Sequence, residues 1–224
     1  MLLPIALDVR EKKCLVAGGG LVAARKAQSL IDCGARVVVI APQVRQEIEE
    51  LQNCVIFRRT FAFDDCRDCA LIFACTNIRE TNEEVLQAAR VFGIPCNVAD
   101  GESDFAMMAT IRRGDVTIGI STQGGSPTLA KHLKNRIEET VGNEYAALLE
   151  ILAARREDMK SDVGNQSARA ELWRRVLDSE VLLLLREGKK KQAEECVDEI
   201  LKSTRETPSS PALLPTLGEG SQTL

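Results

Sequence analysis

The sequence is poor in aromatic residues and contains no long apolar run. Only 4% of its 224 residues are Phe, Trp or Tyr, so a hydrophobic core has to be built from Leu, Ile, Val and Ala. The longest apolar segments, such as 37–42 and 181–185, fall far short of the roughly 20 residues that span a bilayer. The pattern therefore predicts a protein without transmembrane helices.

An excess of basic residues and a signal-peptide pattern are also missing. The formal net charge of −4 argues against a general nucleic-acid-binding surface, which needs a basic excess. Met1–Val9 is apolar but contains Pro4 and Asp8, has no basic start and runs directly into charged residues. We therefore expect a cytoplasmic protein that binds neither nucleic acid nor membranes.

Few cysteines have the spacing of metal ligands, although the chain contains eight of them. Cys66 and Cys69 have CxxC spacing, but no second pair accompanies them at zinc-finger distance. The cysteines in or beside apolar runs, where a thiol behaves as a small hydrophobe, are Cys14, Cys33, Cys54, Cys75 and Cys96. We expect reduced, structural thiols, because cytosolic proteins rarely hold disulfides, and no bound metal.

Strand-like and helix-like segments alternate over the first hundred residues. Segments with helical apolar spacing, at 22–33, 44–52 and 82–92, separate short apolar runs at 13–17, 36–40, 54–58, 70–75 and 94–99. Strands that alternate with helices of about 10–12 residues indicate a parallel sheet with crossover helices. We therefore expect an α/β, Rossmann-like first domain over residues 1–110.

The pattern changes near residue 105. Residues 107–113 and 116–121 flank Gly114–Asp115, a two-residue turn that suits a β-hairpin. Ser126 followed by Pro127 predicts the start of a helix that runs towards residue 141. These features define a central hairpin-and-helix segment, expected at 111–143.

Beyond residue 144 only helical spacing is found. It covers 145–156, 168–177 and 191–201, with a polar loop expected at 161–167. The last residues are rich in Pro, Ser, Gly and Thr. We expect a small all-helical domain over 144–206 and a disordered tail over 207–224.

The clearest motif is a glycine-rich segment between the first strand and the first helix. Residues 18–23, Gly-Gly-Gly-Leu-Val-Ala, satisfy G-x-G-x-x-A. In this motif Gly18 allows a tight turn, Gly20 lets the backbone approach a pyrophosphate, and Ala23 keeps the helix close to the sheet. The N–H groups at the helix start then face the phosphates. The segment predicts a dinucleotide cofactor.

The acidic residue that usually binds the ribose hydroxyls, about 20 residues beyond this motif, is missing. Ala41, Pro42 and Gln43 stand in its place, and no acid appears before Glu47. Backbone groups could hold the ribose instead, or Arg45 could accept a 2′-phosphate. The motif alone therefore leaves NAD and NADP open.

Further short motifs follow in order along residues 2–141. They are Leu3–Pro4–Ile5, Arg25–Lys26–Ala27, Ala74–Cys75–Thr76–Asn77, Cys96–Asn97–Val98–Ala99–Asp100, Asp104–Phe105, Ile120–Ser121–Thr122 and Gly125–Ser126–Pro127. Together with the glycine motif, they resemble precorrin-2 dehydrogenase, the dehydrogenase/ferrochelatase module of siroheme synthase. The resemblance implies NAD-dependent oxidation of precorrin-2 to sirohydrochlorin and, in some members, insertion of ferrous iron to give siroheme.

The resemblance also implies roles for individual residues. Asp100 matches an aspartate implicated in both chemistries, where a carboxylate can act as general base; the alternative is that it caps a turn at a strand end. Thr76 lies against the cofactor or caps the following helix. The full set assigned to NAD is Gly18, Gly19, Gly20, Leu21, Val22, Pro42, Gln43 and Thr76.

A tetrapyrrole substrate carries many carboxylates, so positive charge is expected near the site. The residues assigned to substrate are Asn97, Ser126, Arg112, Arg113 and Lys131, of which Ser126 contributes a helix N-terminus. An ordinary solvated helix face is the other interpretation of the basic residues. The resemblance further implies a homodimer that exchanges its central strands.

A different class of function stays open beside the enzyme. The same scaffold could serve a non-catalytic, NAD-responsive or tetrapyrrole-binding protein that binds both ligands without turnover. The presence of Asp100 argues against this alternative, since a carrier needs no base.

Overall fold

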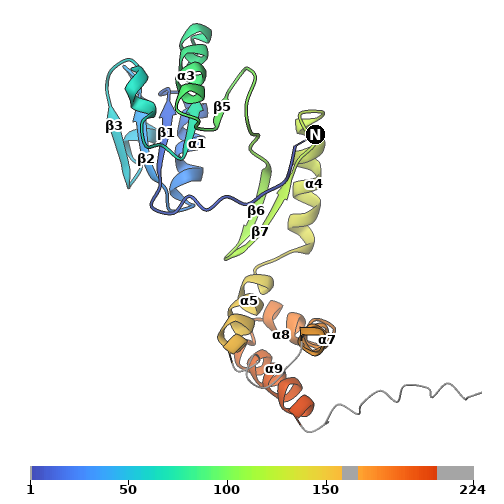
Figure 1. The fold of residues 1–224 in the computed structure, drawn as a ribbon. Coiled ribbons are helices and arrows are strands. Elements are labelled where there is room, and N and C mark those ends of the chain that lie inside the picture. Colours follow the sequence, from blue (N-terminus) through green and yellow to red (C-terminus); the bar gives the residue numbers. More distant parts are fainter. Residues whose placement is uncertain (1, 158–165, 206–224) are drawn as a thin grey trace, which may run out of the picture. The chain divides into compact units, whose positions relative to one another are not determined.

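The computed structural model describes residues 2–157 and 166–205. Two units make up the chain, Met1–Met107 and Met108–Leu224 (Figure 1). The tail expected at 207–224 lies outside the described residues, and so does the loop expected at 161–167, apart from its last two residues, which begin a helix.

Five parallel strands form the sheet of the first unit, in the order β3-β2-β1-β4-β5. They are β1 (Lys13–Ala17), β2 (Arg36–Ile40), β3 (Cys54–Phe57), β4 (Leu71–Ala74) and β5 (Cys96–Val98). Ala17 aligns with Ile40 on one side and with Ala74 on the other. The strands therefore end at one edge, and the predicted Rossmann-like sheet is confirmed.

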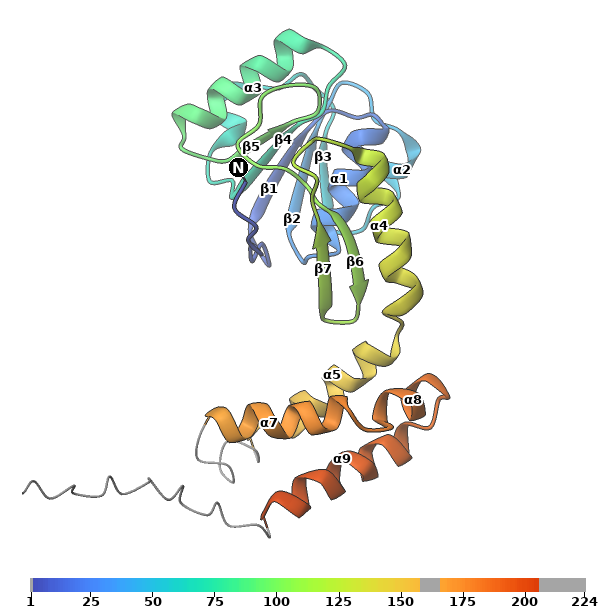
Figure 2. The same cartoon turned by 90° about the vertical axis from the view of Figure 1, so that its right-hand side faces the viewer.

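Helices cover both faces of this sheet (Figure 2). They are α1 (Leu21–Ile31), α2 (Gln46–Glu49) and α3 (Arg79–Val91), accompanied by a 3₁₀ turn, η1 (Phe63–Cys66). Alternate residues of β1 pack into different cores, Val16 with α1 and Leu15 with α3. Because the inner strands are buried on both faces, they appear in the sequence as continuous apolar runs.

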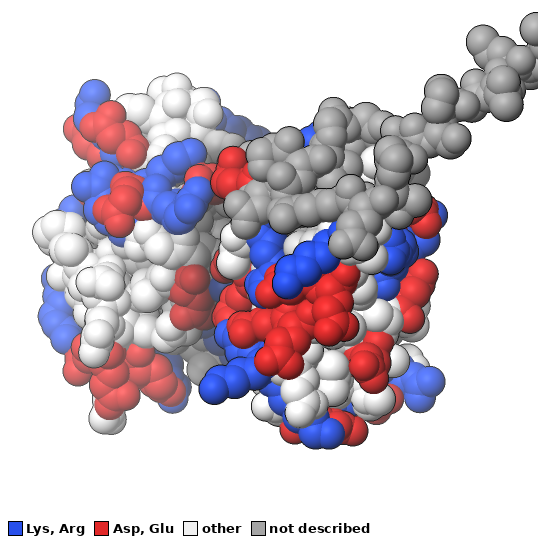
Figure 3. Space-filling model, turned by 90° about the horizontal axis from the view of Figure 1, so that it is seen from below, with Lys and Arg blue, Asp and Glu red and all other residues white. Residues whose placement is uncertain are grey.

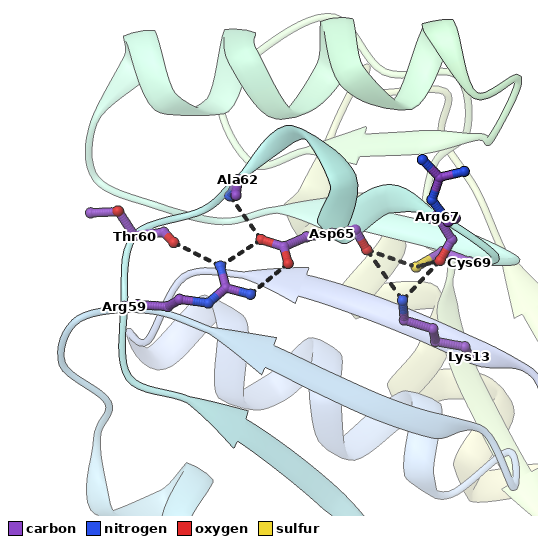
Figure 4. A network of polar contacts seen from close by, with 7 residues as sticks. All are labelled: Lys13, Arg59, Thr60, Ala62, Asp65, Arg67 and Cys69. Atoms are coloured by element: carbon purple, nitrogen blue, oxygen red, sulfur yellow. Dashed lines mark hydrogen bonds and ion pairs between the residues drawn. The ribbon is translucent and has the colours of Figure 1, made fainter.

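The sequence predicted α2 too long and missed η1. Side-chain hydrogen bonds hold this turn, some of them local and some from the distant Lys13 (Figure 4). Asp65 accepts a hydrogen bond from the Ala62 N–H at 2.7 Å and two from the Arg59 guanidinium at 2.6 and 2.7 Å. Lys13 Nζ donates to the Asp65 and Arg67 carbonyls at 3.3 and 2.8 Å. A local pattern does not reveal a turn that a lysine 52 residues away stabilises.

The two cysteines with CxxC spacing lie at this turn. Cys66 and Cys69 are buried, and all eight cysteines of the chain are free thiols. Burial raises the pKa of Cys66 to about 11, which keeps it protonated at neutral pH. These features support the structural interpretation of the thiols. In the described part of the chain, no three His, Cys, Asp or Glu side chains group so as to hold a metal ion.

The second unit begins with the predicted hairpin and helix. β6 (Ala109–Arg113) pairs antiparallel with β7 (Val116–Ile120), and Gly114 between them has φ +56°, as a tight hairpin turn requires. Ser126 caps α4 (Pro127–Thr140), because its Oγ accepts a hydrogen bond from the Leu129 N–H at 3.1 Å. Both predictions are confirmed.

Helices alone form the remainder of the second unit. They are α5 (Glu144–Ala154), α7 (Gln166–Leu177), α8 (Val181–Arg186) and α9 (Lys190–Arg205). Their core includes Leu148, Ile151, Val176 and Val197. The sequence missed α8, whose Val-Leu-Leu-Leu-Leu run has no amphipathic period to mark it as a helix.

No helix in the described ranges combines the length and the hydropathy needed to cross a membrane. Figure 3 shows Lys and Arg side chains interleaved with several groups of Asp and Glu on the face seen from below. This face is therefore not uniformly basic, in line with the net negative charge.

An ion pair between a buried carboxylate and a largely exposed guanidinium joins two helices of the second unit. The Glu144 side chain is 7% exposed and accepts hydrogen bonds from Arg186 Nε and Nη2 at 3.2 and 2.7 Å. The Arg186 guanidinium holds the pKa of Glu144 below its ordinary value. The carboxylate thus stabilises the fold at a pH above its unfolded pKa, and this contribution is lost as the pH falls through the folded pKa.

We expect Glu144→Gln to lower the free energy of unfolding by about 1–2 kcal/mol at pH 7. The difference from wild type should shrink as the carboxylate is protonated, below about pH 4. Urea unfolding followed by the fluorescence of Trp173, the only tryptophan, reports on this unit, because Trp173 packs against its core. A difference that is constant from pH 7 to pH 3 would contradict the prediction.

Candidate cofactor-binding site

The loops that follow three strands are tied together at the carboxyl edge of the sheet. The Gly18 N–H donates to the Ile40 carbonyl at 2.9 Å, and the Cys75 N–H donates to the Ala17 carbonyl at 2.7 Å. One strand further along, the Ala99 N–H donates to the Ala74 carbonyl at 2.9 Å. Open α/β sheets bind ligands at this edge, so the candidate site begins here.

Two glycines of the motif are required by close packing between these loops. Gly18 has φ +132°, and a Cβ there would lie 2.4 Å from the Cys75 carbonyl oxygen. A Cβ on Gly19 would lie 1.9 Å from the Gln43 carbonyl oxygen. Any side chain at either position would push the neighbouring loop away.

Gly20 has a different environment. A Cβ at this position would meet no atom within 4 Å, so nothing in the protein itself demands glycine. Gly20 is the N-cap of α1 without a side-chain cap, and the first helical hydrogen bond is donated by Ala24. The preceding N–H groups therefore lack helical partners. Open space beside exposed N–H groups fits the pyrophosphate of a dinucleotide.

Four other predicted cofactor residues come from the start of α1 and from the loop after β2, which meet at the glycines. Leu21 and Val22 begin α1 and are 47% and 45% exposed, a large fraction for apolar side chains beside the glycine loop. Pro42 and Gln43, after β2, are also exposed. The Arg45 N–H donates to the Gly19 carbonyl at 3.0 Å, which joins this loop to the glycine loop. The structure brings these predicted residues together.

Thr76 is engaged in local structure after β4. Its Oγ1 lies 2.8 Å from Asn82 Oδ1 and 2.9 Å from the Ile78 carbonyl oxygen, and its N–H donates to Asn82 Oδ1 at 3.0 Å. Asn82 Nδ2 in turn donates to the Thr76 carbonyl at 3.0 Å. These bonds support the helix-capping interpretation of Thr76, and its contact with NAD stays a prediction.

Asn82, which is 5% exposed, belongs to no motif that the sequence displays. One signal was present. Asn82 lies on the same helical face as the buried Val85, Leu86 and Ala89, where a polar residue needs a hydrogen-bonding partner.

Asp100 lies in the turn after β5, and other side chains hold that turn. Ser103 Oγ accepts from the Val98 N–H at 2.9 Å, and Asp104 Oδ2 accepts from the Cys96 N–H at 2.9 Å. Asn97 is buried and donates to the Phe105 carbonyl at 2.8 Å. The exposed Asp100 carboxylate has no hydrogen-bond or ion-pair partner among the residues that the structure describes. The alternative role, capping the turn, is thus taken by Ser103 and Asp104.

The remaining predicted substrate residues belong to the second unit. Ser126 caps α4, as described above, and Arg113 donates to the Val141 and Arg112 carbonyls at 3.1 and 3.0 Å. Arg112 and Lys131 are exposed, and Lys131 has no ion-pair partner within the described residues. Arg113 therefore has a structural role in the hairpin, whereas the exposed Lys131 can form an ion pair with a substrate carboxylate.

The chain matches three families in succession. Residues 5–109 match a family of NAD(P)-binding domains, residues 113–140 match the central region of sirohaem biosynthesis proteins, and residues 144–201 match the sirohaem synthase dimerisation region. The sequence is 39% identical over 197 residues to siroheme synthase of Methylococcus capsulatus, covering 86% of this chain and 42% of that protein.

Two further likenesses extend over most of the chain. Identity to siroheme synthase of Nitrosomonas europaea is 33%, covering 97% of this chain and 47% of that protein. The chain thus spans less than half the length of these curated relatives. A solved structure of SirC, precorrin-2 dehydrogenase, superposes with a TM-score of 0.69 and 25% identity, covering 88% of this chain and all of that one.

The two kinds of glycine predict opposite mutant behaviour. Gly20→Ala should keep the thermal stability of wild type and weaken NAD binding by roughly tenfold or more, because the new methyl group enters the space left for the pyrophosphate. Gly18→Ala should instead lower stability by at least about 2 kcal/mol, since its backbone conformation and the Cys75 contact both exclude a side chain. Thermal unfolding and calorimetric titration with NAD measure the two effects. Wild-type NAD affinity in Gly20→Ala would refute the assignment of Gly20.

Proposed function

The chain belongs to the precorrin-2 dehydrogenase and siroheme synthase family, and on this basis we propose that it oxidises precorrin-2 to sirohydrochlorin with NAD. The observation that supports this most is the position of Asp100. Its carboxylate has no hydrogen-bond or ion-pair partner in the described part of the chain and lies at the sheet edge that also carries the glycine loop. A dinucleotide-binding fold thus presents one uncommitted acid where ligands of such folds bind.

In this reaction the substrate loses a hydride and a proton. Bound NAD would supply the hydride acceptor. Asp100 accepts the proton from the macrocycle as general base. The loop bonds made by Asn97, Ser103 and Asp104 fix the backbone on either side of Asp100 and so position its carboxylate.

Backbone groups of this chain would hold the cofactor. The N–H groups at the start of α1 would bind its pyrophosphate, and the loop at Pro42 and Gln43 would hold its ribose. Leu21 and Val22 would cover it with apolar surface and exclude water. Lys131 and Arg112 bind substrate carboxylates through charge-assisted hydrogen bonds.

Asp100→Asn should reduce the rate of NAD-dependent precorrin-2 oxidation by about 10²–10⁴-fold, the usual contribution of a general base. NAD affinity should stay unchanged. Formation of sirohydrochlorin, followed by absorption spectroscopy, measures the rate, and calorimetric titration measures NAD affinity.

Glu102→Gln is the matched control. Glu102 is an acid of the same loop whose side chain is 82% exposed and lies 3.5 Å from Arg90. This variant should oxidise precorrin-2 at the wild-type rate. Full activity in Asp100→Asn would remove Asp100 from the mechanism. A wild-type protein that binds NAD and precorrin-2 without turnover would establish the non-catalytic alternative.

Ferrous iron insertion into sirohydrochlorin is a further part of the proposal. Iron is a substrate in that step, so a permanent ligand set is not required, and the Asp100 carboxylate could strip pyrrole protons or deliver the metal. Following Fe²⁺ incorporation with and without NAD separates this activity from the oxidation.

A homodimer is the assembly that we propose, formed through the central segment at 111–143. None of the residues of α4 is buried, and Leu129 and Leu133 on this helix are 49% and 39% exposed. A helix of 14 residues without a buried side chain needs another surface to cover its leucines. The match of residues 144–201 to a dimerisation region also supports a dimer.

The double variant Leu129→Glu/Leu133→Glu should convert the dimer to a monomer, because it places charges in the proposed interface. Light scattering after size exclusion gives the mass. Leu183→Glu is the comparison, since Leu183 is 56% exposed on α8, inside the matched dimerisation region. Loss of the dimer in Leu183→Glu alone would move the interface from α4 to the helical segment.

The proposal includes a cytoplasmic location. Eight free thiols, five of them buried, suit a reducing compartment, because oxidising compartments favour disulfides.

A further inference from the structure

The loop after β2 carries an ion pair that the cofactor motif does not predict. The Arg45 Nε lies 3.2 and 3.0 Å from the two carboxylate oxygens of Glu47, and its Nη2 lies 2.8 Å from Oε1. The carboxylate thus engages two nitrogens of the guanidinium at once. Arg45 also holds the pKa of Glu47 below its ordinary value, so Glu47 is ionised at neutral pH.

This pair lies in the loop that follows β2 and contacts the glycine loop. The Arg45 N–H donates to the Gly19 carbonyl, and the preceding Gln43 carbonyl packs against Gly19 itself. Dinucleotide-binding folds contact the ribose with residues at this strand end, beside the glycine loop. Ala41, Pro42 and Gln43 carry no charge, so Arg45 and Glu47 are the first charged side chains after β2.

We infer that Glu47, by occupying Arg45, makes the site select NAD over NADP. This inference rests on the proposed function, since it concerns the cofactor of the same site. The two dinucleotides differ only in the 2′-phosphate of NADP, a dianion for which an arginine is the usual partner. An unoccupied Arg45 would attract it, whereas a paired one offers no net positive charge.

Discrimination between NAD and NADP does not require a strong ion pair between Arg45 and Glu47. The side chains of Arg45 and Glu47 are 54% and 48% exposed, and such pairs contribute at most about 1 kcal/mol to stability. If the pair opens, the Glu47 carboxylate stays two residues from Arg45 and repels the incoming phosphate. A change of the Glu47 charge therefore alters nucleotide preference without disrupting the fold.

Glu47→Gln tests the inference, with affinities for NAD and NADP measured by calorimetric titration. Wild type should bind NAD at least roughly tenfold more tightly than NADP. Glu47→Gln should tighten NADP binding by roughly tenfold and leave NAD affinity within about twofold. Adding Arg45→Ala to Glu47→Gln should abolish the gain, since the freed guanidinium is its cause. The gain should also decrease with added salt.

Glu49→Gln provides the matched control on the same helix. Glu49 pairs with Arg58 in a second exposed ion pair, so this variant changes the net charge equally without freeing Arg45. It should leave the ratio of NAD to NADP affinity unchanged.

The outcomes separate this inference from the proposed function. Equal wild-type affinities for NAD and NADP, an unchanged ratio in Glu47→Gln, or an equal shift in Glu49→Gln would each overturn the role of Glu47 alone. Failure of wild type to bind either dinucleotide would overturn the proposed function, and the inference with it.

Discussion

Contact between the glycine loop and its two neighbouring loops is the constraint on which the site depends. Gly18 packs against the carbonyl of Cys75, and Gly19 packs against the carbonyl of Gln43. These contacts are possible because β1, β2 and β4 end in register, so that each loop leaves the sheet beside the next. The helix start that follows is consequently held at a fixed position, and the space beside Gly20 stays open.

Hydrophobic periodicity and turn residues predicted the elements that the local sequence determines. The strands at 36–40 and 13–17, the hairpin at Gly114 and the Ser126 cap follow from local spacing and turn chemistry, and all are found. Elements that depend on distant side chains were missed, as η1 shows through Lys13. The sequence also indicated residues that lie together at the glycine loop, such as Leu21, Val22 and Gln43. It could not show that Thr76 is bound by Asn82, because this pairing depends on how β4 meets α3.

In the loop after β5, too, the sequence does not separate the candidate catalytic residue from the residues that hold the loop. Asn97, Ser103, Asp104 and Asp100 are all polar, and spacing alone does not separate those that hold the loop from one that is available for substrate. Hydrogen bonding separates them, since the first three bind backbone atoms and Asp100 binds none among the described residues. Its availability distinguishes a catalytic proposal from a structural one.

The open space at Gly20 results from the absence of a side chain, and the cofactor contacts proposed beside it come from backbone atoms. Under this proposal, most neighbouring side chains can change without affecting how the dinucleotide is held, provided that positions 18–20 stay small. The proposed chemistry, in contrast, depends on the single carboxylate of Asp100, which a separate loop carries. Under this proposal, one substitution at position 100 abolishes the activity and leaves cofactor binding intact, so nucleotide binding by itself does not report on catalysis.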